Sequence, residues 1–442
     1  MQIQLSEHFS YKKLLRFTLP SIIMMVFTSI YGVVDGFFVS NYVGKTPFAA
    51  VNLIMPFLMV LGTIGFMFGT GGSALVSKTM GEGKPEKARR IFSLLVYVSI
   101  FLGILLTVFG MIFIRPIAAW LGASGSMLED CVTYGRVILI ALTAFVLQNE
   151  FQSFFVAAER PQLGLFVTVA AGVTNMALDA LFVAVFRFGL VGAAAATMLS
   201  QMVGGIIPLV YFLLPNKSVL RLVKTKWNGK FLAKACANGS SEMMSNISMS
   251  LVSMLYNAQL IKFAGENGVA AYGVLMYVNF VFLAMFIGLS IGSAPIISYH
   301  YGAENHAELK SLREKSLTVI GVFSVGMFLL AQMLAIPFSK IFVGYDTELM
   351  NLTCGAFRIY SFLFLFAGVN IFGSSFFTAL NNGMISALIS FLRTLVFQVA
   401  AVLIFPIFWG IDGIWLSAVA AECMSVIITI IFLIAKRNKY HY

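Results

Sequence analysis

The segment GGSALVSKTMG at Gly71–Gly81 decides the fold, because a similar segment, GSAPIISYHYG, stands at Gly292–Gly302. The two align at an offset of 221 residues and share their first glycine, a serine and their last glycine. Each follows a long apolar run. Two such segments at equal places in the two halves of a chain indicate an internal repeat.

Two further matches support the repeat. FGLVG at Phe188–Gly192 aligns with WGIDG at Trp409–Gly413 at the same offset, and Arg136 pairs with Arg358 at an offset of 222. Each half contains six apolar runs, an even number, so both halves would enter a bilayer in the same orientation. We expect the two halves to be related by an axis along the membrane normal.

The composition places the protein in a membrane. Of its 442 residues, 60% are hydrophobic and 11% are charged, whereas soluble domains carry about 25% charged residues. The four cysteines lie far apart and indicate neither disulfides nor a zinc site. No cleavable signal peptide is evident, so the first apolar run is interpreted as a membrane span.

A helical span needs about 20 predominantly apolar residues, and twelve runs satisfy this length. We therefore predict an all-α integral membrane protein with twelve transmembrane helices in two pseudo-symmetric six-helix lobes. The predicted domains are an N-lobe (1–214), an inter-lobe loop (215–233) and a C-lobe (234–442). The predicted spans are 15–41, 48–77, 91–114, 131–156, 162–186, 189–214, 234–262, 269–299, 315–337, 350–379, 384–408 and 411–435.

The basic residues predict the orientation. With the N-terminus placed inside, 21 Lys and Arg residues lie in inner loops and tails and five in outer loops. This asymmetry predicts that both termini are cytoplasmic, in a multi-pass protein of the cell membrane. The same distribution explains the net charge of +11 without any role in binding nucleic acid.

Two carboxylates fall inside predicted spans at similar depth. Asp35 lies late in the first span and Asp179 late in the fifth, both in the outer half of the bilayer. Tyr31 and Asn175 each stand four residues earlier, one helical turn away on the same face. Because charges in a membrane are costly, we predict that the two acids take up a proton or a small cation such as Na⁺. The alternative is that each is a polar residue satisfied near a helix end.

Other intramembrane polar residues have less certain roles. Pro20 could form a gating kink in the first span, or a static bend. Glu242 could line the mouth of a central cavity, whereas Glu150 is expected to be solvated near the inner end of its span. Arg393 requires a partner that the sequence does not identify, and the role of Glu422 is open.

The sequence resembles the multidrug and toxic compound extrusion (MATE) transporters of the DinF-like and MepA-like group, over residues 10–435. The resemblance depends on several motifs taken together. These are Pro20 with Tyr31 and Asp35, the glycine-rich end of span 2 leading to Gly81–Lys84, AAERP at 157–161, Asn175 with Asp179, and GLVGAAAAT at 189–197.

The resemblance implies a V-shaped fold and an antiporter that exports cationic, amphipathic drugs or toxic compounds in exchange for H⁺ or Na⁺. It implies a cation-coupling site formed by Asp35, Asp179, Asn175, Tyr31 and Thr197. Tyr134 and Asn149 match polar positions of the N-lobe, and Gln152 stands where some relatives carry Asn. With Glu242, these three residues are candidates for the substrate cavity.

Two other functions are compatible with a polytopic membrane protein. A flippase for a lipid-linked or polysaccharide precursor belongs to the same superfamily, but the acids of the N-lobe favour a cationic cargo. A membrane enzyme is disfavoured, because the sequence has no HExxH, GxSxG or clustered His and Asp residues. We expect no cofactor and no resident metal, apart from a possible coupling Na⁺, and we expect a monomer in membrane lipid with small-molecule cationic substrates. The sequence does not identify the substrate.

Overall fold

The computed structural model describes residues 3–344 and 346–442, and every regular element in them is helical. The first half contains α1 (Tyr11–Phe38), η1 (Val39–Val43), α2 (Lys45–Gly81), α3 (Pro85–Trp120), α4 (Gly125–Ile140), α5 (Leu142–Ala157), α6 (Pro161–Asp179), η2 (Ala180–Val185) and α7 (Gly189–Leu213). The second half contains α8 (Gly229–Gly302), α9 (His306–Val343), α10 (Thr347–Tyr360), η3 (Ser361–Leu363), α11 (Phe364–Ala379), α12 (Gly383–Phe391), η4 (Leu392–Val396), α13 (Phe397–Ala435) and α14 (Arg437–Tyr440).

Two of these helices fold back on themselves. At 1.5 Å per residue, the 74 residues of α8 would extend roughly 110 Å, far more than the hydrocarbon core of a bilayer. The chain reverses at Gly265, and α13 is interrupted in the same way at Gly410; both glycines have positive φ. Such backbone geometry is accessible to glycine at little cost.

Counted with these reversals, the described helices cross the membrane twelve times. By length and composition alone, nine helical segments could cross, and α4 with α5, bent by 56°, forms a tenth. The reversal within α13 splits one of the nine, and the first arm of α8 supplies the twelfth. All twelve crossings coincide with predicted spans.

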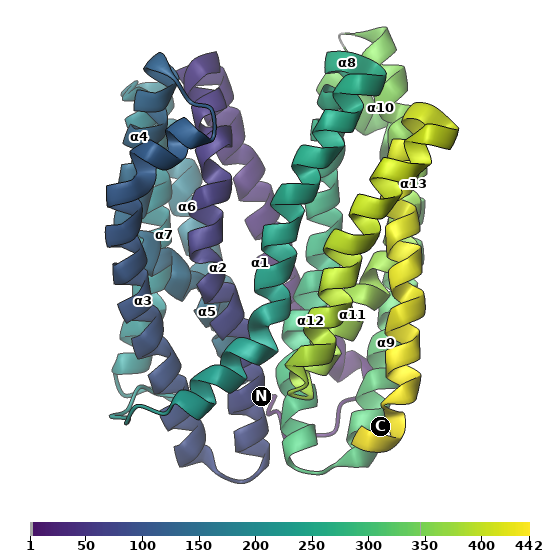
Figure 1. The fold of residues 1–442 in the computed structure, drawn as a ribbon. Helices are drawn as coiled ribbons and strands as arrows, with labels where there is room; N and C mark the ends of the chain where they lie inside the picture. Colours follow the sequence, from purple (N-terminus) through teal and green to yellow (C-terminus); the bar gives the residue numbers. More distant parts are fainter. Residues whose placement is uncertain (1–2, 345) are drawn as a thin grey trace.

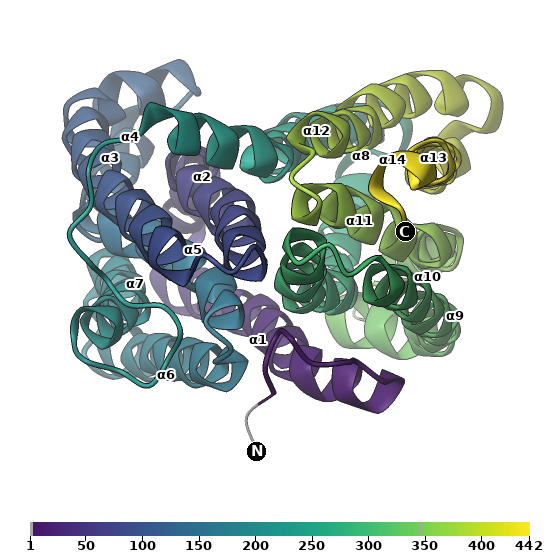
Figure 2. The same ribbon diagram turned by 90° about the horizontal axis from the view of Figure 1, so that it is seen from below.

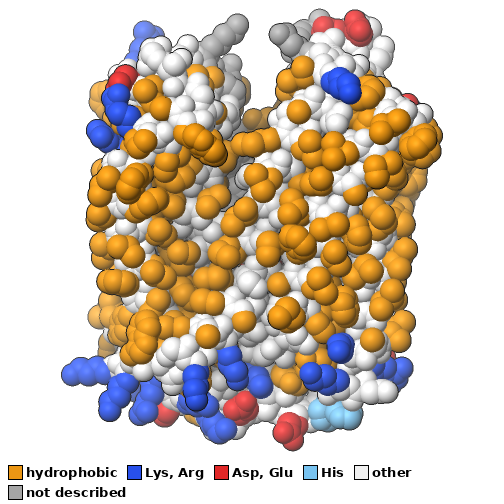
Figure 3. Space-filling model, viewed as in Figure 1, with side chains coloured by type: hydrophobic (Ala, Val, Ile, Leu, Met, Phe, Trp, Pro, Cys, Tyr) orange, Lys and Arg blue, Asp and Glu red, His pale blue; other side chains and the backbone are white. Residues whose placement is uncertain are grey.

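The helices form two groups that lie side by side (Figure 1; Figure 2). A broad belt of hydrophobic side chains surrounds both groups, and basic side chains gather at one end (Figure 3). Both chain termini lie at that end, which we call the basic face (Figure 1). At the opposite end a notch separates the two groups (Figure 3). The molecule is therefore closed at the basic face and open at the other.

The closed end is formed by glycines at which helices of the two halves touch. A Cβ on Gly81 of α2 would overlap the carbonyl oxygen of Tyr299 in α8, and a Cβ on Gly302 would overlap that of Lys78. The two contacts are related by the 221-residue offset. Gly71 contacts the backbone of Gly239 in the same way. We call these contacts the glycine seam; small residues allow helix backbones to approach this closely in membranes.

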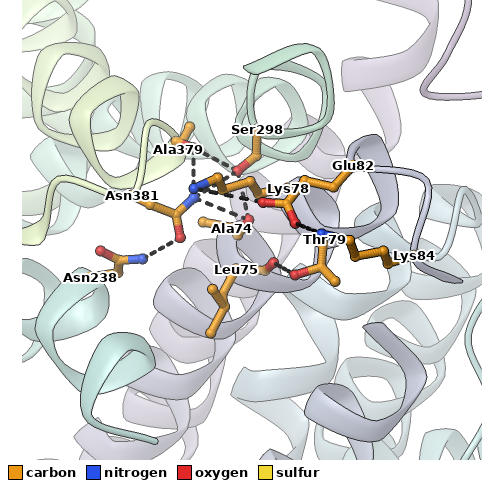
Figure 4. Close-up of polar contacts among 10 residues, drawn as sticks. All are labelled: Ala74, Leu75, Lys78, Thr79, Glu82, Lys84, Asn238, Ser298, Ala379 and Asn381. Carbon is orange, nitrogen blue, oxygen red and sulfur yellow. Dashed lines mark hydrogen bonds and ion pairs between the residues drawn. The ribbon is translucent and has the colours of Figure 1, made fainter. Parts of the chain in front are cut away.

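A polar contact reinforces the seam (Figure 4). The Ser298 hydroxyl lies 2.7 Å from the carbonyl oxygen of Ala74 in the other half and 2.6 Å from that of Ala379. Asn381 lies beside Ser298, and its side-chain oxygen accepts a hydrogen bond of 2.7 Å from Asn238. Ser298 is one of the repeat residues that identified the fold.

The N-terminal residues form a second bridge between the halves. The backbone N–H of Leu5 donates to the Glu159 carboxylate of the first half at 2.8 Å, and that of Phe9 donates to Glu308 of the second half at 2.9 Å. Leu5 and Phe9 are fully buried. The basic face is thus closed by packed backbone and by this buried segment.

The close backbone contacts of the glycine seam predict that one added methyl group lowers the stability of the fold strongly. Gly302→Ala should lower the thermal unfolding temperature of the detergent-solubilised protein, because its Cβ meets backbone that cannot move aside. Gly321→Ala in α9 is the matched control, since no atom outside its own helix backbone lies within 4 Å of an added Cβ there. The control should be neutral or stabilising by up to about 1 kcal/mol. Equal unfolding temperatures for the two variants would contradict the seam.

Candidate functional site

Three helices of the first half bring two carboxyl groups together. Asp35 is on α1, Asp179 is the last residue of α6, and Thr197 is in the third turn of α7. The Thr197 hydroxyl donates to a carboxylate oxygen of Asp35 at 3.2 Å. Asp35 and Asp179 are close enough to interact electrostatically. The sequence placed these acids at similar depth, and the structure shows that they are neighbours.

The surroundings of the pair are polar but enclosed. Asp179 and Asn175 are buried, and Asp35 is half-buried. The Asn175 amide donates to Thr197 at 3.4 Å and also interacts with Asp35. Two neighbouring ionised carboxylates in an apolar interior repel each other strongly. This arrangement is therefore favourable only when the pair holds at least one proton or another cation.

Two tyrosines lie next to the pair. The Tyr134 hydroxyl of α4 interacts with Thr197, and its ring is fully buried. The Tyr31 hydroxyl lies one turn from Asp35 on α1 and interacts with the Gln148 side chain of α5. The structure thus gathers all five predicted coupling residues in one region and adds Tyr134 to them. Because Tyr134 has no exposed surface here, its predicted place in a substrate cavity is not visible in this conformation.

Within the part of the chain that the structure describes, three π-helical segments lie next to charged residues of the membrane-spanning helices. η1 begins four residues after Asp35, η2 begins directly after Asp179, and η4 contains Arg393. π-helical segments occur frequently at functional sites. No periodicity in the apolar pattern predicted them.

Other predicted residues lie apart from the pair. Asn149 and Gln152 of α5 are buried, but neither forms a hydrogen bond to Asp35 or Asp179 within the described residues. The expectation that Glu150 is solvated is wrong: it is fully buried, beside the hydroxyl of Ser99. The error arose because position along a span indicates depth but not which face of the helix packs against a neighbour. Pro20 lies inside α1, which continues as α-helix from residue 11 to 38.

The second half contains a different charged cluster. Arg393 forms an ion pair of 2.8 Å with Glu422, which also accepts a hydrogen bond of 2.7 Å from Asn370. Both charged side chains are at least 85% buried. Glu242 is half-buried on α8, and its carboxylate interacts electrostatically with the same arginine. The structure therefore supplies the partner of Arg393 that the sequence left open.

Comparison with known proteins decides the family. The MatE family model matches residues 20–181 and again residues 243–404, one segment in each half. The chain belongs to the MatE family. Members of this family are transporters and not enzymes. The resemblance recognised in the sequence is thereby confirmed.

Relatives agree with this membership over nearly the whole chain. The multidrug export protein MepA of Staphylococcus aureus strain MSSA476 is 24% identical over 434 residues, covering 97% of this chain and 94% of that protein. A solved structure of MATE in the straight conformation has a TM-score of 0.93 at 22% identity, over 99% of this chain and 98% of the other. An outward-facing multidrug resistance MATE family transporter also has a TM-score of 0.93, at 22% identity, with coverage of 99% and 97%. These structures confirm the predicted MatE fold with twelve helices.

The buried ion pair of this MatE protein predicts non-additive effects on stability. Glu422→Gln should destabilise the fold by about 3 kcal/mol, because it leaves Arg393 charged and largely buried. Adding Arg393→Gln should restore part of that loss. The measurement is the free energy of unfolding in a double-mutant cycle.

The control for this cycle is an exposed pair. Arg115 and Glu129 lie 2.6 Å apart with about half of each side chain exposed, and Glu129→Gln should change stability by less than about 1 kcal/mol. Additive losses for Glu422→Gln and Arg393→Gln would show that the buried pair contributes no coupling energy.

Proposed function

We propose that this MatE transporter exports cationic, amphipathic compounds from the cell in exchange for protons. The observation that carries the proposal is the proximity of Asp35 and Asp179 around Thr197 and Asn175, within the membrane-spanning part of the first half. Two neighbouring carboxyl groups take up a proton readily, and deprotonation leaves a negative site that attracts a cation. Proton and cationic substrate then compete for the same charge.

The charges of the second half agree with a cationic cargo. Its buried cluster contains two acids, Glu242 and Glu422, and one base, Arg393. When Asp35 and Asp179 are added to this cluster, the acidic side chains outnumber the basic one. A flippase for a phosphate-bearing precursor would need the opposite sign. The printed name of the relative MepA, a multidrug export protein, supports varied drug-like substrates.

The orientation follows from the basic residues. We infer that the basic face is cytoplasmic, because inner loops carry the excess of Lys and Arg. The notch at the opposite end (Figure 3) then opens to the exterior, where protons arrive and substrate leaves. In this state the carboxyl pair holds a proton, and the glycine seam blocks access from the cytoplasm.

The helix α1 connects the carboxyl pair to the seam. Its outer half carries Asp35, and its inner half packs on α8, where Gly288 contacts the backbone of Ile22 and Gly292 contacts Thr18. Pro20 lies between these contacts and removes one backbone hydrogen bond of the helix. A change of charge at Asp35 can therefore be transmitted along α1 to the contact between the halves.

The experiment is uptake of a fluorescent cationic dye into energised inverted vesicles, whose outer surface is the cytoplasmic face of the membrane, with the proton and sodium gradients collapsed separately. Collapse of the proton gradient should stop transport. Asp35→Asn should reduce proton-driven transport by about tenfold or more. It removes the coupling between proton binding and substrate binding, and such a coupling is typically about 1–3 kcal/mol.

Asp412→Asn is the matched control, because this carboxylate is exposed, and it should transport like wild type. Undiminished proton-driven export by Asp35→Asn would refute the coupling role of the carboxyl pair. Transport that stops only when the sodium gradient is collapsed would assign the site to Na⁺ instead.

A further inference from the structure

A basic cavity lies at the basic face, away from the carboxyl pair. It has a volume of about 950 Å³, is open on one side, and is bordered by the first turns of α3, the segment between α7 and α8, and the start of α8. Five basic side chains and one acidic side chain line it: Lys84, Lys87, Arg90, Lys224, Lys226 and Glu86. Its remaining wall includes Leu94, Trp227 and Phe231.

The cavity has a large excess of positive charge. Its one acid, Glu86, is already bound by Arg89 at 2.6 Å. Among the described residues, Arg90, Lys224 and Lys226 form no ion pair. No side chain caps the first turn of α3, which also faces the cavity. Free backbone N–H groups at such a helix start favour an anion.

The walls of the cavity are held in place by the fold. The backbone of the inter-lobe segment is fixed to α3, because Arg89 donates to the carbonyl of Val219 at 2.9 Å and the N–H of Val223 donates to Ser93 at 2.8 Å. Lys224 and Lys226 directly follow this anchor. On the other side, the Lys87 ammonium lies 5.3 Å from the centre of the Phe231 ring at the start of α8. The backbone around the cavity is thus fixed by the fold, and its five basic side chains are exposed to solvent.

An apolar surface leads from the cavity into the membrane belt. Tyr97 and Phe101 follow Arg90 at helical spacing on one face of α3 and are 40% and 66% exposed, whereas Leu94 at the cavity wall is buried. The exposed face continues through residues 104, 105, 108 and 112. Figure 3 shows basic side chains along the edge directly below the hydrophobic belt. Trp227, 75% exposed at the cavity wall, is of the type enriched at membrane interfaces.

We propose that this cavity binds the phosphate headgroup of an anionic phospholipid, whose acyl chains lie along the exposed face of α3. A small anion would use only the basic residues, whereas an anionic lipid uses these and the adjoining apolar face. Basic pockets at the inner side of membrane proteins suit such headgroups. The bound lipid joins α3 of the first half to the beginning of α8, and it stabilises the inter-lobe segment between them. This inference does not depend on the ion that drives transport.

The test uses the purified full-length protein in detergent, with phosphatidylglycerol as the probe and its binding measured by native mass spectrometry and by the shift in unfolding temperature. The triple variant Arg90→Ala, Lys224→Ala, Lys226→Ala removes cations that form no ion pair, so it should fold. It should bind phosphatidylglycerol at least about tenfold more weakly, since each basic residue near an anionic surface contributes to binding.

The control triple variant is Lys12→Ala, Lys310→Ala, Arg437→Ala, which removes the same charge from exposed positions of the same face. It should bind like wild type. An equal loss of affinity in this control would overturn the proposal, because the attraction would then be non-specific. Equal binding of phosphatidylcholine would also overturn it. If inorganic phosphate or glycerol phosphate competed for the cavity as effectively as the lipid does, the cavity would be a site for a free anion instead.

Discussion

The glycine seam is the contact on which the rest of the structure depends. At Gly81 and Gly302 the backbones of α2 and α8 approach so closely that a single methyl group has no room. In lipid no hydrophobic force drives the two halves together, so close backbone packing is what holds them. Closure at this end leaves the opposite end open, and it determines which side of the membrane reaches the carboxyl pair. Two other glycines of α8, Gly288 and Gly292, hold the inner half of α1 against α8, so the helix that carries Asp35 is packed against a helix of the seam.

The two halves share a fold but differ in charge. At the 221-residue offset, Arg393 corresponds to Gly172 and Glu422 to Gln201, while Asp35 corresponds to Tyr256. The first half therefore has two neighbouring acids without a base, the pair that we propose takes up the proton. In the second half Arg393 and Glu422 form an ion pair, so each charge is already compensated by the other. The repeat positions of the seam keep glycine in both halves because the seam needs small residues on both sides, whereas the interior positions carry different side chains in the two halves.

Much of this was predictable from the sequence, for physical reasons that concern particular residues. Twelve spans followed from the length of apolar runs, and the repeat followed from Gly71, Ser77 and Gly81. The depth of Asp35 and Asp179 followed from helical rise. Other features depend on packing between helices and were missed: the burial of Glu150, the pairing of Arg393 with Glu422, and the π-helical turns beside the charges. The pattern of apolar and polar residues along the sequence does not show which face of a membrane-spanning helix packs against a neighbouring helix. The basic cavity was missed for a similar reason, because it forms only when the inter-lobe segment is anchored to α3.

The central claim is that the proton state of the Asp35–Asp179 pair controls which end of the molecule is open. The most direct test measures distances between spin labels in lipid nanodiscs, after replacement of the four native cysteines. One label pair, at Gln162 and Lys310, reports on the basic face, and another, at Trp120 and Ile341, reports on the opposite face. The account predicts that acidic pH favours short distances at the basic face and long ones opposite. It predicts that alkaline pH shifts the population the other way, and that the double variant Asp35→Asn, Asp179→Asn loses this response. A pH response that is unchanged in the double variant would contradict the account.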